Sequence, residues 1–175
     1  LALNARERSS ALAAIAPDRS AAGAISRAEQ SLRRDPDDQH ALALYAVSAL
    51  GVVKETADSS WYVRADDAAR RALAINPGNV PALDATATLA NARHRFRDAI
   101  APATTSLRLA PDRFAPLEIL TDAHIELGQY RAGFAAAAKR LELRPDLASY
   151  SRASYAAELR GEHAQATELM RLAAD

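Results

Sequence analysis

The chain of 175 residues contains no cysteine, and aromatic residues make up only 5% of it. Without cysteine, the chain can form no disulfide bond, no thiolate metal site and no thiol nucleophile. No apolar run approaches the ~20 residues that a helix needs to cross a bilayer. The sequence therefore excludes thiol-based catalysis and predicts no membrane span in this chain.

An excess of charge of one sign is also missing, because 22 Lys and Arg residues balance 22 Asp and Glu residues. Proteins that bind nucleic acid or an anionic membrane by electrostatic attraction usually carry a basic surplus. We therefore expect no nucleic-acid partner.

Catalytic motifs are absent as well. The four histidines form no His-Glu-x-x-His zinc pattern, and no Ser/His/Asp grouping stands in a glycine-rich turn. The six glycines build no loop that could cradle a phosphate. The sequence therefore predicts a protein that is not an enzyme, with no catalytic residue, no metal site and no cofactor.

What the chain does contain is alanine-rich sequence without a period-two alternation of apolar residues. Alanine has the highest helix propensity, and its small side chain lets neighbouring helices approach closely. Strands would need runs of alternating β-branched and aromatic residues. These features predict an all-α protein.

Three prolines, Pro77, Pro111 and Pro145, recur at intervals of 34 residues, and Pro36 precedes the first of them by 41. Each of the three closes a similar phrase: RALAINP, TSLRLAP and KRLELRP. A fixed period in this range indicates a repeat array, in which each unit is a supersecondary element that cannot bury its apolar face alone.

Small residues stand at one fixed distance before these prolines, at Ala65, Ala99 and Gly133. The pattern resembles the tetratricopeptide repeat, in which small residues lie where two antiparallel helices cross and a proline follows the second helix. The resemblance implies a right-handed α-solenoid of about five helix pairs in a single domain, residues 1–175. The approximate units are 5–38, 39–79, 80–113, 114–147 and 148–175.

Local signals mark several helix ends. Gly128 fits a chain reversal that requires a positive φ, and Asp146 fits a helix N-terminus. Pro102 falls inside an expected helix, where it removes a backbone hydrogen bond. It predicts a bend near residues 98–101.

The unit that ends at Pro77 is seven residues too long, and the excess lies around residues 52–60. Extra residues in a solenoid form a loop or lengthen a helix without disturbing the stack. Trp61 and Tyr62 follow the excess and are the only adjacent aromatics. Either they pack under the longer segment, or they form an exposed aromatic anchor for a partner.

The resemblance also implies a binding surface, because the first helices of successive tetratricopeptide units line a concave groove that receives peptides or partner helices. Glu118, Asp122 and Glu126 are spaced four residues apart and share one helix face. They would either receive a basic segment or form a solvated face. By register the groove residues are His40, Ala43, Val47, Asp84, Thr88, Asn91, Glu118, Asp122, Ile125, Glu126 and Arg152.

These expectations favour a scaffold that binds a protein or peptide partner of unknown identity in its groove. A second interpretation is a homodimer through the array ends, where Leu169, Met170 and Leu172 would be exposed. A third is the repeat region of a larger protein with its activity elsewhere. Since the first residue is Leu1, we expect a fragment, a processed form or a trimmed version. The default location is the cytoplasm, with export or lipid anchoring if an upstream signal was removed.

Overall fold

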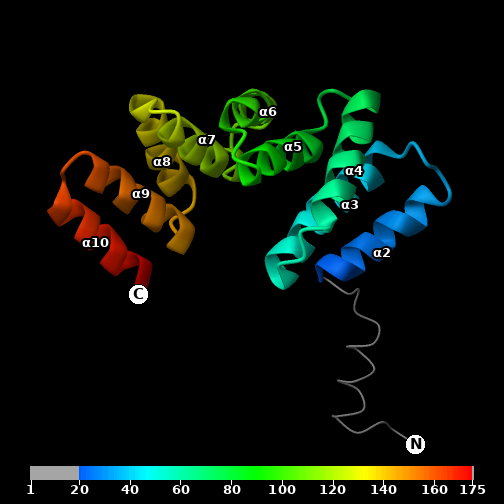
Figure 1. Ribbon diagram of the computed structural model, residues 1–175, viewed down its shortest axis with the longest axis horizontal. Coiled ribbons are helices and arrows are strands. Elements are labelled where there is room, and N and C mark those ends of the chain that lie inside the picture. The colour runs from blue at the N-terminus through cyan, green and yellow to red at the C-terminus, as the bar shows by residue number, and fades with distance from the viewer. Residues whose placement is uncertain (1–19, 175) are drawn as a thin grey trace, which may run out of the picture.

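The computed structural model describes residues 20–174, which form helices and no strand (Figure 1). This confirms the all-α fold. The first helix expected in unit 5–38 falls outside the described residues. The helices are α2 Ala21–Leu32, α3 Gln39–Thr56, α4 Trp61–Ile75, α5 Val80–Ala92, α6 Phe96–Leu109, α7 Ala115–Glu126, α8 Tyr130–Leu143, α9 Leu147–Leu159 and α10 His163–Ala174.

Consecutive helices pair as hairpins: α3 with α4, α5 with α6, α7 with α8, and α9 with α10. Each second helix also packs against the first helix of the next pair, and α3 contacts α5 just as α5 contacts α7. Figure 1 shows the pairs following one another along an arch, with α2 to α4 in one limb and α9 and α10 in the other. Helices α3, α5 and α9 border the inner side of the arch, and α6 lies outside α5.

Small side chains fill the interior where the helices of a pair cross. Ala65 and Ala99 are completely buried, and Gly133 occupies the same place in α8. A Cβ atom on Gly133 would lie 2.7 Å from Cγ1 of Ile125 and 3.3 Å from the carbonyl oxygen of Thr121. Helices α7 and α8 therefore approach too closely for any larger residue, which is why the repeat needs a small one here.

The turns of the α5–α6 and α7–α8 pairs share one hydrogen-bond pattern. The N–H of Gln129 donates to the carbonyl of His124 at 2.8 Å, and Arg95 donates to Ala90 at the same distance one unit earlier. Gly128 has a φ of 71°, as predicted. A hydrogen bond from an N–H to the carbonyl five residues earlier satisfies one of the last carbonyls of the helix. It requires that the residue just before the donor has a left-handed backbone conformation.

Most of the seven extra residues of the unit that ends at Pro77 lengthen its first helix. Helix α3 has 18 residues, whereas α5, α7 and α9 have 13, 12 and 13. It ends at Thr56, and the next residue, Ala57, caps it with a left-handed φ of 58°. The extension therefore projects past the ends of the neighbouring first helices.

Two further local signals concern Asp146 and Pro102. Asp146 caps α9 as predicted, because its side chain accepts from the N–H of Ser149. Helix α6 runs without interruption from Phe96 to Leu109 although Pro102 lies inside it. The bend near residues 98–101 remains a prediction.

Candidate functional site

A hollow of about 300 Å³ lies between α3, α5 and the start of α7. We call it the concave pocket. Three residues that the sequence placed in the groove line it, namely Val47, Asp84 and Thr88. The full lining is Val47, Leu50, Gly51, Lys54, Asp84, Ala85, Thr88, Arg113 and Ala115.

The apolar floor of the concave pocket comes from α3 and α5. Val47 is 44% exposed, and the neighbouring Leu44 is also exposed on α3. Leu50 and Ala85 are buried beneath them. An apolar surface with a small number of polar groups at its edge is typical of a site that binds another molecule.

Asp84 lies at the edge of this pocket but carries no unpaired charge. Its carboxylate accepts from Oγ of Ser106 at 2.5 Å and from Nε of Arg113 at 2.8 Å. A second guanidinium nitrogen of Arg113 forms an ion pair with the same carboxylate. The charge of Asp84 is therefore balanced within the chain.

Glu118 is paired as well. One of its carboxylate oxygens accepts from Nε and Nη2 of Arg140, at 2.9 and 2.7 Å. Arg140 comes from α8, is only 1% exposed, and also donates to both carboxylate oxygens of Asp146 at 3.0 Å. The ring of Phe114 lies 4.8 Å from its guanidinium carbon. One buried cation therefore joins α7, α8 and the start of α9.

Asp146 has a pKa below the ordinary aspartate value. Burial acts to raise this pKa, but hydrogen bonds from Arg140 and from the N–H of Ser149 outweigh it. Hydrogen bonds and a nearby cation favour the charged form of a carboxylate. The pair with Arg140 therefore keeps Asp146 ionised.

Asp122 forms a bidentate ion pair with Arg152 of α9. Nε and Nη2 of the arginine each donate to one carboxylate oxygen of Asp122, both at 3.0 Å. Burial acts to lower the pKa of Arg152, but the hydrogen bond and charge of Asp122 outweigh this effect, so the pKa lies above the ordinary arginine value.

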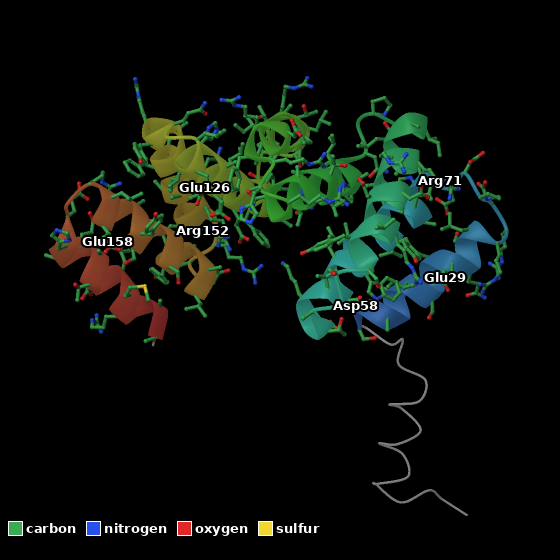
Figure 2. The ribbon with its side chains drawn as sticks, in the orientation of Figure 1. Glu29, Asp58, Arg71, Glu126, Arg152 and Glu158 are labelled. Carbon is green, nitrogen blue, oxygen red and sulfur yellow. The ribbon has the colours of Figure 1, made fainter. Side chains whose placement is uncertain are left out.

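A second hollow of about 80 Å³ adjoins the Asp122–Arg152 pair, with Glu126 and Tyr155 in its lining. Figure 2 labels Glu126 on α7 and Arg152 on α9. Glu126 is exposed and has no ion pair within residues 20–174.

The acidic face on α7 therefore differs from the expectation. The sequence suggested three mutually repelling carboxylates, but Glu118 and Asp122 each bind an arginine of the same chain. The arginines come from other helices, 22 and 30 residues along the chain. Only Glu126 keeps the free carboxylate that a basic segment would need.

The remaining groove residues vary in exposure. His40 is exposed, whereas Ala43 is only 2% exposed because α5 packs against it. Ile125 is buried beside Gly133. Asn91 is half-buried, and its Oδ1 has no partner within the described part of the chain. Ala43 offers no surface to a partner, and we leave it out of the proposed site.

Trp61 and Tyr62 are half-buried and pack against the apolar cluster between α3, α4 and α5. The guanidinium carbon of Arg64 lies 4.6 Å from the centre of the Trp61 ring. This arrangement favours the packing interpretation of the aromatic pair over an exposed anchor.

The sequence analysis did not identify Lys54 and Arg113, which line the concave pocket. Lys54 belongs to the lengthened part of α3, and Arg113 follows Pro111 in a loop. The additional residues before Ser60 were the sequence feature that could have pointed to Lys54 as a pocket residue, because a longer first helix brings new side chains to the groove.

Two other kinds of site are absent within residues 20–174. No cluster of His, Asp and Glu side chains there could hold a metal ion. None of the described helices combines the length and apolar character needed to span a membrane.

No family model and no curated protein matches this chain. Solved structures do match it. The structure of MamA has a TM-score of 0.68 at 14% identity and covers 99% of this chain and 94% of that chain. MamA from Desulfovibrio magneticus RS-1 has a TM-score of 0.68 at 17% identity, with coverage of 87% and 85%. The thermophilic TPR protein TTC0263 from Thermus thermophilus has a TM-score of 0.69 at 16% identity, with coverage of 87% and 81%. The chain therefore has the tetratricopeptide-repeat type of fold, an all-α helical solenoid.

Proposed function

We propose that this chain is a non-catalytic scaffold that binds a segment of a partner protein on the inner side of its arch. The observation that carries the proposal is the concave pocket, where Val47 exposes apolar surface beside a hollow of about 300 Å³. Exposed apolar surface in a concavity is a common feature of interaction sites.

The chemistry of the groove supports binding over catalysis. The ionisable groups Asp84, Glu118 and Asp122 are held in arginine pairs that fix neighbouring helices. An active site usually brings a nucleophile, a base and an oxyanion donor together around one reacting atom. Here the charged groups stabilise the scaffold on which the apolar surface is displayed.

The proposal can be tested with peptides selected on the full chain from a displayed library of random dodecapeptides. Val47→Asp places a charge on the pocket floor and should weaken binding of the selected peptides at least tenfold, which corresponds to about 1.4 kcal/mol. Val63→Asp is the matched control, because Val63 is 70% exposed on α4 and does not line the concave pocket. Equal binding to both variants would contradict the proposal.

Self-association through the C-terminal end is a second candidate. Met170 is 48% exposed, whereas its counterparts Ala103 and Ala137 are buried in earlier units. The hollow beside Met170 is lined mainly by polar side chains, including Glu158, His163 and Thr167. Light scattering on the full chain tests this candidate. A dimer that Met170→Asp dissociates would support it, and a monomer at high concentration would exclude it.

A further inference from the structure

The lengthened part of α3 contributes a basic group to the concave pocket. By register with α5, which ends at Ala92, a first helix of ordinary length would end near Gly51. Lys54 lies beyond that point, in the additional helical turn, and it lines the pocket together with Gly51. The basic group is therefore a feature of this chain's longer unit and not of the repeat as such.

Lys54 is exposed and has no ion-pair partner within the described residues. The other charged groups of the pocket are Asp84 and Arg113, which balance each other. Counting these three side chains, the pocket carries a surplus of one positive charge. A basic segment would therefore be repelled at this place, and a carboxylate would be attracted.

The floor beneath Lys54 is apolar, because Val47, Leu50, Ala85 and Ala115 line the hollow. Its volume of about 300 Å³ is at the lower limit of ligand sites, which favours one or two side chains over a large ligand. Apolar burial would supply most of the affinity, and the cation at the edge would select the neighbouring residue.

We infer that the concave pocket recognises an acidic protein segment in which a bulky apolar side chain lies next to an Asp or Glu residue. The apolar side chain fills the hollow, and the carboxylate pairs with Lys54. This inference rests on the proposed function and adds the chemistry of the partner to it.

The test uses the full chain and peptides selected on it from the random dodecapeptide library. We expect the selected peptides to be enriched in an acidic residue within one or two positions of a Leu, Ile, Met or Phe. Lys54→Glu should weaken their binding about tenfold. The chain contains only one other lysine, Lys139, which is exposed on α8. Lys139→Glu is therefore a matched control and should leave binding unchanged.

A second experiment measures how fast the amino groups of Lys54 and Lys139 are acylated. A bound peptide should slow acylation of Lys54 severalfold without slowing acylation of Lys139, as measured by mass spectrometry. This result does not depend on a substitution, so it remains informative if a variant folds poorly.

The outcomes separate the inference from the proposed function. Peptides that bind the wild-type chain but not Val47→Asp, with no acidic enrichment and no effect of Lys54→Glu, would overturn the inference and leave the groove intact. Peptides that bind Val47→Asp normally would overturn both. A selection that returns no peptides with an acidic residue beside an apolar one would also overturn the inference. This is the result expected if a second copy of the chain fills the pocket.

Discussion

Arg140 donates two hydrogen bonds to one carboxylate oxygen of Glu118, at 2.9 and 2.7 Å, although the arginine side chain is almost fully buried. A buried cation without such partners would be strongly unfavourable. The stability of the packing between α7 and α8 therefore depends on Arg140.

Removal of this cation should destabilise the protein. Arg140→Ala leaves Glu118 and Asp146 without their shared partner and is expected to lower the free energy of unfolding by about 3–5 kcal/mol. Urea denaturation followed by circular dichroism measures the change. Arg131→Ala, at an exposed position on the same helix, is the control and should change stability by less than about 0.5 kcal/mol. Similar effects of the two variants would contradict the role assigned to Arg140.

The free energy of unfolding should also fall in acid, because the carboxylate of Asp146 becomes protonated. Its folded-state pKa is lowered, so its contribution is present above the unfolded-state pKa of ~3.9 and is lost as pH falls through the lower folded value. Asp146→Asn cannot titrate and should show a smaller loss of unfolding free energy between near pH 7 and near pH 2 than the wild-type chain. Urea denaturation at the two pH values measures this. An equal loss in both proteins would contradict the account.

The repeat and its helix pairs were predictable because they depend on local and periodic signals. Proline spacing marks the ends of second helices, and small residues such as Ala99 and Gly133 mark the crossings. The arginine pairs were not predictable. Glu118 and Asp122 show their spacing within α7, but Arg140 and Arg152 approach them only through the stacking of α8 and α9. The lengthening of α3 was one of two alternatives, since added residues fit a loop equally well.

The close crossing at Gly133 gives a test of the interior packing. Gly133→Ala would gain about 1 kcal/mol of helix propensity, yet its Cβ would lie 2.7 Å from Ile125. Overpacking should prevail and destabilise the protein by about 1–3 kcal/mol, as thermal or urea unfolding would show. The penalty should shrink in an Ile125→Ala background, because Cγ1 is then absent. A stabilised Gly133→Ala variant would show that the helices can separate without loss.

Pro102 gives a test of helix strain. A proline inside a helix is about 3 kcal/mol less favourable than alanine, so Pro102→Ala should raise the free energy of unfolding by up to that amount. Pro81, in the first turn of α5, lacks this penalty, and Pro81→Ala should give no gain. Urea denaturation of both variants decides the matter. If Pro102→Ala is no more stable than the wild type, the predicted bend carries no strain.

The central claim is that partners bind on the inner side of the arch, at the concave pocket. Hydrogen exchange on the full chain, with and without a selected peptide, tests it without any substitution. We predict slower exchange in the segments of α3 and α5 around Val47 and Thr88, and no change in the exposed face of α8. Protection confined to α8 or α10, with α3 and α5 unaffected, would contradict the account.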